Sequence, residues 1–209
     1  MTGKGGGMDE DAREQGLLTA LTTEHFVLQT SRSATIAESV GRATVFLSML
    51  SAALIGLGFV SNTGHLLRPY LGAVLPTLIV TGLLTFARLA QNMVENSLDL
   101  QRIQRIRAYY HRRFDGDEGF FADAVTSGGG PRAAWAAVGT RPGRWHLLLT
   151  AAALVGVVTA LLLGLGVTLL AGLGGVSPGP AIALGVVVAL AAFAAEIMYL
   201  DRMSVSMNR

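Results

Sequence analysis

The chain has 209 residues, of which 51% are hydrophobic and 14% are charged, and it contains no cysteine. A soluble domain carries about 25% charged residues, and the mean hydropathy here is +0.50, so the composition excludes an ordinary soluble protein. The lack of cysteine excludes disulfides and thiolate metal sites, and a formal net charge of +2 leads us to expect no nucleic-acid partner.

Three stretches of the chain carry no Asp, Glu, Lys or Arg: residues 43–67, 69–87 and 145–195. A helix that crosses about 30 Å of hydrocarbon needs about 20 apolar residues. The first two stretches hold one such helix each, whereas the third holds two, because residues 174–180 contain three glycines and two prolines. The sequence therefore predicts an all-α membrane protein with four transmembrane helices, at about 43–61, 70–90, 146–172 and 181–200, joined by outer loops at 62–69 and 173–180.

The basic residues predict the orientation of these helices. Of the 16 Lys and Arg residues, fifteen lie in residues 1–42, 88–145 and 201–209, and only Arg68 lies elsewhere. Loops that stay in the cytoplasm are enriched in Lys and Arg, so both termini should be cytoplasmic. The expected parts are listed in chain order: a cytoplasmic N-terminal helical segment (1–42), a first transmembrane hairpin (43–90), a cytoplasmic helix with a flexible connector (91–145), a second transmembrane hairpin (146–200) and a cytoplasmic tail (201–209).

The cytoplasmic segments predict a helical stalk. No glycine or proline interrupts residues 88–114, and the seam positions there follow alternating steps of three and four: Phe86, Leu89, Met93, Asn96, Leu100, Ile103, Arg107, Tyr110 and Phe114. The N-terminal segment has the same spacing at Leu18, Leu21, His25, Leu28 and Arg32. The two segments either pack on each other or pair between subunits. Short helices at 120–125 and 131–138 are expected in the connector.

Motifs for catalysis are absent from the sequence. It contains no phosphate-binding loop of the G-x-x-x-x-G-K-[ST] type, no H-E-x-x-H and no G-x-S-x-G. The four histidines, at positions 25, 65, 111 and 146, are scattered over several predicted segments. We therefore expect no enzyme, no catalytic or metal site and no cofactor.

Two ionisable residues lie near the inner ends of predicted transmembrane helices, Arg88 and Glu196. An ionisable group at that depth is costly unless it pairs or reaches water. One hypothesis is that the two side chains form an intramembrane pair. The alternative is that Arg88 extends to the cytoplasmic headgroups and Glu196 ends its helix beside Asp201.

Polar and small residues recur along the predicted spans. One polar stripe at helical spacing consists of Thr77, Thr81, Thr85, Arg88 and Asn92, and it either lines a water-filled path or serves helix packing. Small residues repeat every fourth position in three places: Ser48, Ala52 and Gly56; Ala152, Gly156, Ala160 and Gly164; and Ala181, Gly185 and Ala189. Such faces allow helices to approach closely in lipid, and Glu196 lies on the last of them.

The densest basic patch lies on the cytoplasmic helix after the second span. It consists of Arg102, Arg105, Arg107, Arg112 and Arg113. This patch could bind anionic lipid headgroups, a nucleotide or an acidic partner. A solvated helix face is the alternative.

Several stretches resemble known bacterial proteins. The runs Arg88-Leu-Ala-Gln-Asn92 and Gln101-Arg-Ile-Gln-Arg-Ile-Arg107-Ala-Tyr-Tyr110, with Leu28-Gln-Thr30 and Arg42, resemble small membrane proteins of high-GC Gram-positive bacteria. The resemblance covers about the first 115 residues and implies a bacterial plasma membrane, with no site residues. The plan of a membrane hairpin with cytoplasmic helices is also similar to SLATT-type effectors of bacterial defence systems, a likeness of architecture alone.

These observations favour a non-enzymatic integral membrane effector or signalling scaffold. Its expected partners are the lipid bilayer, further copies of itself in a homo-oligomer, and a cytoplasmic partner or small ligand. The alternative function is a small oligomeric ion channel or transporter that uses the threonine stripe with Arg88 and Glu196.

Overall fold

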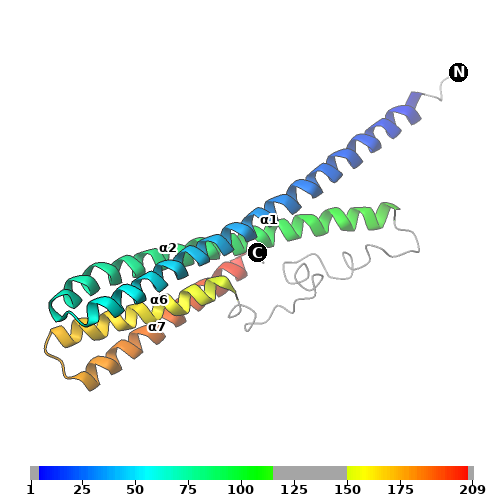
Figure 1. Cartoon of the computed structure of the whole chain (residues 1–209). Helices are drawn as coiled ribbons and strands as arrows, with labels where there is room; N and C mark the ends of the chain where they lie inside the picture. The colour runs from blue at the N-terminus through cyan, green and yellow to red at the C-terminus, as the bar shows by residue number, and fades with distance from the viewer. Residues whose placement is uncertain (1–4, 115–149, 207–209) are drawn as a thin grey trace. The chain divides into compact units, whose positions relative to one another are not determined.

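A computed structural model describes residues 5–114 and 150–206 of the chain. Within these residues it contains four α-helices and no strand: α1 (Gly5–Ser61), α2 (Gly64–Phe114), α6 (Ala151–Leu173) and α7 (Pro178–Ser206) (Figure 1). Each helix is long and apolar enough to cross a membrane, as the charge-free stretches predicted. The expected connector, including its short helices at 120–125 and 131–138, lies outside the described residues.

The connection between α1 and α2 is shorter than predicted. The loop expected at 62–69 is wrong, because α2 begins at Gly64 and only two residues separate the helices. A tight turn closes the connection, with the Thr63 amide donating to the Val60 carbonyl at 2.9 Å. Pro69 lies inside α2. The fixed φ of proline is compatible with a helix, although its missing N–H removes one hydrogen bond of the helix.

The turn between α6 and α7 was predicted from its glycines and prolines. The Gly174 amide donates to the Leu170 carbonyl at 3.0 Å and closes α6, and Gly175 follows with a φ of 85°, which side chains disfavour. The next helix begins at Pro178 rather than near residue 181. Proline is well suited to the first position of a helix, because an N–H at that position would have no carbonyl acceptor within the helix.

The described residues fall into two compact units. The first, which we call the helix-pair unit, holds residues 5–36 of α1 and 95–114 of α2. The second, the four-helix unit, holds residues 37–61 and 64–94 of the same two helices together with α6 and α7. Each unit has its own cluster of buried apolar side chains.

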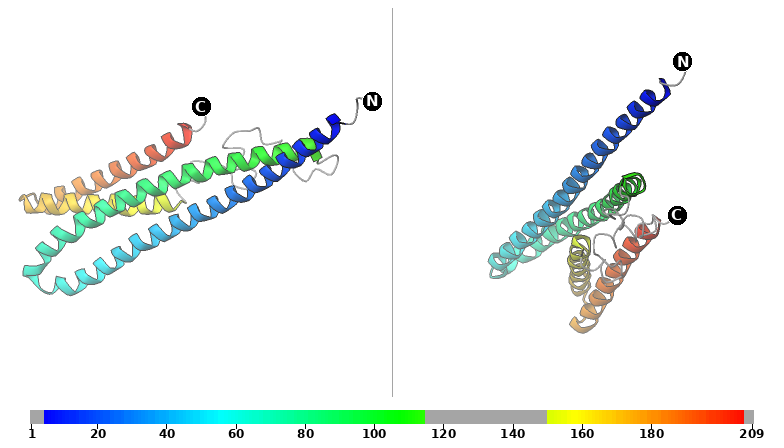
Figure 2. Two further views of the ribbon diagram at one scale, coloured as in Figure 1. Left: turned by 90° about the horizontal axis from the view of Figure 1, so that it is seen from above. Right: turned by 90° about the vertical axis from the view of Figure 1, so that its right-hand side faces the viewer.

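Small residues bring α6 and α7 into close contact in the four-helix unit, where the two helices lie side by side (Figure 2). A methyl group at Gly164 would meet the Gly185 carbonyl oxygen at 2.5 Å, and one at Gly185 would collide with the hydroxyl of Thr168. The predicted packing face of α6 is buried at all four positions. On α1, Ser48 and Ala52 are exposed, so these two positions of the face predicted there do not pack within the chain.

Some large apolar side chains of the four-helix unit are buried in its core, and others are exposed on its surface. Phe46 is fully buried, with 0% of its surface exposed, and belongs to one cluster with Leu89 and Val155. Phe59, which lies thirteen residues after Phe46 on α1, is 78% exposed. Leu54 and Val187 are also exposed. Extended exposed apolar surfaces meet either lipid or another protein.

Candidate functional site

The helix-pair unit is held together by a small apolar cluster between α1 and α2. Leu28 of α1 packs with Ile103 and Ile106 of α2, and Leu21 and Tyr110 pack against these three. The predicted seam thus pairs the two helices within one chain. Ile106 is buried in it, although the expected spacing did not include this residue.

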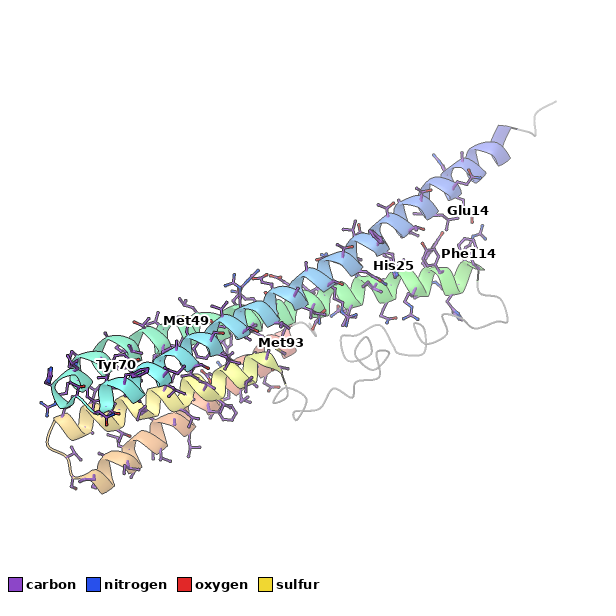
Figure 3. The ribbon with its side chains drawn as sticks, in the orientation of Figure 1. Glu14, His25, Met49, Tyr70, Met93 and Phe114 are labelled. Atoms are coloured by element: carbon purple, nitrogen blue, oxygen red, sulfur yellow. The ribbon has the colours of Figure 1, made fainter. Side chains whose placement is uncertain are left out.

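A groove of about 860 Å³ lies between the same two helices. Its polar lining residues are Thr22, His25, Gln29, Arg32, Ser33, Gln104, Arg107 and Tyr110, and its apolar ones are Ile36, Leu100, Ile103 and Phe114. Figure 3 marks His25 on α1 and Phe114 at the end of α2. The volume falls within the range of small-molecule sites, about 300–1,000 Å³.

Polar side chains occupy seam positions at this groove where a purely structural pair of helices would have apolar ones. His25 and Arg32 continue the spacing of Leu21 and Leu28, and Arg107 continues that of Ile103. Two polar atoms at the groove, Nδ1 of His25 and Oε1 of Gln104, are buried without a hydrogen-bond partner. A buried polar atom without a partner costs free energy, about 1–3 kcal/mol, so the groove is not optimised for helix pairing alone.

Other polar contacts orient the groove residues. Nε of Arg32 donates to Oδ1 of Asn96 at 2.9 Å, which holds the guanidinium of Arg32 against α2. Ser31 donates to the carboxylate of Asp99 at 3.1 Å, and Asp99 is also paired with Arg102 at 3.9 Å. The carboxylate of Asp99, which precedes the lining residue Leu100 in sequence, is therefore bound to other groups.

The predicted basic patch is divided by these contacts. Arg107 lines the groove, whereas Arg102 pairs with Asp99. Arg113 donates to both carboxylate oxygens of Glu14 at 2.9 Å, and this hydrogen bond, more than the charge of Arg113, lowers the pKa of Glu14. Arg105 and Arg112 are exposed on α2.

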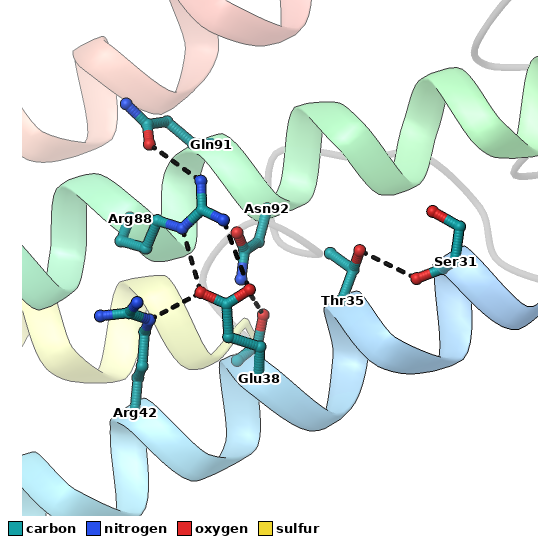
Figure 4. A network of polar contacts seen from close by, with 8 residues as sticks. Ser31, Thr35, Glu38, Arg42, Arg88, Gln91 and Asn92 are labelled. Atoms are coloured by element: carbon teal, nitrogen blue, oxygen red, sulfur yellow. Dashed lines mark hydrogen bonds and ion pairs between the residues drawn. The ribbon is translucent and has the colours of Figure 1, made fainter.

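Arg88 belongs to a separate polar network in the four-helix unit (Figure 4). Its Nε and Nη2 donate to the two oxygens of Glu38 at 3.1 and 3.3 Å, and Nε of Arg42 donates to the same carboxylate at 2.7 Å. Hydrogen bonds from Arg88 and then Arg42 lower the pKa of Glu38, which lies before the predicted span at 43–61. The i,i+4 pair of Glu38 and Arg42 is readable in the sequence, but the contact with Arg88 on another helix is not.

The hypothesis that Arg88 pairs with Glu196 is not supported by these contacts. Arg88 binds Glu38, and neither carboxylate oxygen of Glu196 has a hydrogen-bond partner. Glu196 is 8% exposed, and one of its oxygens lies 2.7 Å from the place that a methyl group at Gly156 would take. Glu196 therefore lies on the packed face of α7, as its spacing from Gly185 and Ala189 predicted.

The threonine stripe of α2 does not converge on one site. Thr77 is exposed and donates back to the Ala73 carbonyl at 2.8 Å, and Thr81 and Thr85 are half-buried. Asn92 is 2% exposed and donates to the hydroxyl of Ser39 at 3.0 Å. These local contacts are typical of helix packing, which was one of the two interpretations of the stripe.

We expect the thermal stability of the protein to depend on Glu38 in acid. A carboxylate whose pKa is lowered in the folded state contributes stability above its ordinary pKa of 4.5, and this stability is lost as the pH falls through the lower, folded pKa. Unfolding midpoints followed by circular dichroism between pH 7 and pH 3 should therefore be lower at pH 7 for Glu38→Gln than for the unmodified chain, with a flatter fall in acid.

Glu24, an exposed carboxylate on the same helix, provides the matched control. The Glu24→Gln variant should keep the pH profile of the unmodified protein. If Glu38→Gln also kept both the midpoint and the profile, the network around Glu38 would contribute nothing to stability.

Comparisons with known proteins do not assign the chain to a family. The chain matches no protein-family model, no curated protein and no solved structure at a significant level. Among residues 5–114 and 150–206, no group of three or more His, Asp or Glu side chains could hold a metal ion.

Proposed function

We propose that the chain is a non-enzymatic sensor or signalling scaffold of a bacterial plasma membrane, anchored by four transmembrane helices, whose helix-pair unit binds a small ligand in the cytoplasm. Four apolar windows of sufficient length support the anchor. The placement of fifteen of the 16 Lys and Arg residues outside the short outer loops supports a cytoplasmic position for the helix-pair unit.

One observation carries the ligand-binding role: the groove between α1 and α2 is lined by polar side chains at seam positions. A helix pair that served only as a spacer would be more stable with leucine or isoleucine in place of His25, Arg32 and Arg107. Polar groups that lower the stability of a fold are typical of binding sites, where the ligand supplies the missing contacts.

A thermal-shift screen with a groove-filling variant tests this role. Ser33 and Thr23 are both exposed on α1 and both donate back to a carbonyl four residues earlier, but only Ser33 lines the groove. We expect pools of small bacterial metabolites to raise the unfolding midpoint of the detergent-solubilised chain and of Thr23→Trp, because a ligand that binds only the folded state stabilises it.

The Ser33→Trp variant should lose this response because the indole fills the groove. The role is contradicted if no pool shifts the unmodified chain, or if Ser33→Trp responds as Thr23→Trp does.

A second candidate function, a small oligomeric channel or transporter, is favoured by one specific observation. The carboxylate of Glu196 is buried among apolar helices with no hydrogen-bond partner for either oxygen, and ionisable groups in transmembrane helices often mark ion pathways. Ion flux into proteoliposomes distinguishes the two functions: a channel predicts flux that Glu196→Gln or Thr81→Val abolishes, whereas a sensor predicts none.

A further inference from the structure

The charged groups at the groove of the helix-pair unit all have the same sign. Arg32 on α1 and Arg107 on α2 contribute two guanidinium groups, and no Asp or Glu is among the lining residues. The carboxylate of Asp99, which precedes the lining residue Leu100, accepts a hydrogen bond from Ser31 and forms an ion pair with Arg102. A groove with two cations and no lining carboxylate attracts anions.

The guanidinium of Arg32 is oriented before any ligand arrives. Its Nε donates to Oδ1 of Asn96 at 2.9 Å, so the side chain is held across the gap between the two helices. Arginine is suited to oxyanions because its planar group can donate two parallel hydrogen bonds to one of them. Two arginines on different helices favour a phosphate over a carboxylate, because a phosphate offers more acceptor oxygens.

His25 adds a hydrogen-bond donor to the same wall. The amide nitrogen of Gln29 lies 3.0 Å from Nε2 of His25, and since an amide nitrogen can only donate, Nε2 must accept. The proton of the neutral ring is then on Nδ1, which is buried and has no hydrogen-bond partner. An unsatisfied donor on a residue of a groove that two guanidinium groups also line is a second reason to expect an acceptor-rich ligand.

We infer that the groove binds a small anion of the phosphate class between Arg32 and Arg107, an inference that rests on the proposed role of this groove as a ligand site. The unpartnered Oε1 of Gln104 indicates that the physiological ligand also carries an O–H or N–H donor. Tyr110 and Phe114, whose ring centroids lie 6.3 Å apart, line the same groove and offer an aromatic surface for an organic part of that ligand.

Isothermal titration of the full chain in detergent with inorganic pyrophosphate tests the inference. We expect saturable binding with one site per chain, and a loss of affinity of about ten-fold or more for Arg32→Gln and for Arg107→Gln, since a hydrogen bond to a charged group contributes about 1.5–3 kcal/mol. Arg105→Gln is the matched control, because Arg105 is exposed on the same helix and does not line the groove.

Each outcome bears on a different claim. Equal losses for Arg105→Gln and Arg107→Gln would overturn the site, because they would indicate a diffuse basic surface, and an absence of saturable pyrophosphate binding would overturn the phosphate class. The ligand-binding role would stand in that second case if an uncharged metabolite still shifted the unmodified chain and not Ser33→Trp. Circular dichroism of both arginine variants checks that the helices persist.

Discussion

The Gly185→Ala variant is expected to be less stable than the unmodified protein by roughly 2–3 kcal/mol, a large effect for one methyl group. A methyl group at this position would lie 2.6 Å from the Gly164 carbonyl oxygen and would collide with the hydroxyl of Thr168. The threonine side chain can rotate, but the backbone of α6 can move away only if the two helices separate.

Gly172 provides a control of opposite sign in the same hairpin. It lies in α6 with no atom within 4 Å of the place that a methyl group would take. Since alanine is preferred to glycine in a helix by about 1 kcal/mol, Gly172→Ala should be neutral or stabilising. Denaturant titration in detergent micelles, followed by circular dichroism, measures both variants, and equal midpoints would show that α6 and α7 do not meet at Gly164 and Gly185.

The Phe46→Ala variant should lose about 2–3 kcal/mol of stability, whereas Phe59→Ala should change it by less than about 0.5 kcal/mol. Both residues lie on α1, but Phe46 is fully buried in the four-helix unit and Phe59 is largely exposed. A buried phenylalanine in a soluble protein contributes about 3–5 kcal/mol. In the proposed membrane setting we expect a smaller loss, because lipid is as apolar as the core and only packing is lost.

The same denaturant titration compares the two phenylalanine variants. Similar losses in both would mean that the face of α1 that carries Phe59 is buried against protein in the native state. A loss for Phe59→Ala alone would contradict the arrangement of the core around Phe46.

The sequence was sufficient for most of the fold, since a long apolar helix leaves a simple signal in the sequence. Long runs without charge predicted the four apolar helices, and the glycines and prolines of residues 174–180 predicted the turn after α6. The start of α2 was misplaced because the charge-free stretch begins after Arg68, whereas the helix begins at Gly64, before that charge.

Contacts between helices were less accessible from the sequence. The spacing of small residues predicted the close packing of α6 and α7 because it follows from helix geometry alone. The partner of Arg88 could not be predicted, because the sequence does not show which carboxylate on another helix lies beside it. Only the packing of α1 against α2 brings Glu38 to Arg88.

The groove has a counterpart in the sequence pattern of the seam. Asn96 and Arg107 interrupt an otherwise apolar seam, and in the structure Asn96 orients Arg32 while Arg107 lines the groove. Polar residues at seam positions are thus a usable sign of a binding site in paired helices, but their partners depend on the register between the helices, which periodicity does not determine.

Cysteine labelling in intact membrane vesicles tests most directly whether lipid surrounds the apolar helices. The chain has no cysteine of its own, so a single introduced thiol reports on one position, and Leu54 and Phe26 are both well exposed, at 59% and 74%. A water-soluble maleimide should react with Phe26→Cys once the vesicles are opened and should not react with Leu54→Cys until the protein is denatured. Equal reaction of the two variants in opened vesicles would contradict a membrane-spanning α1.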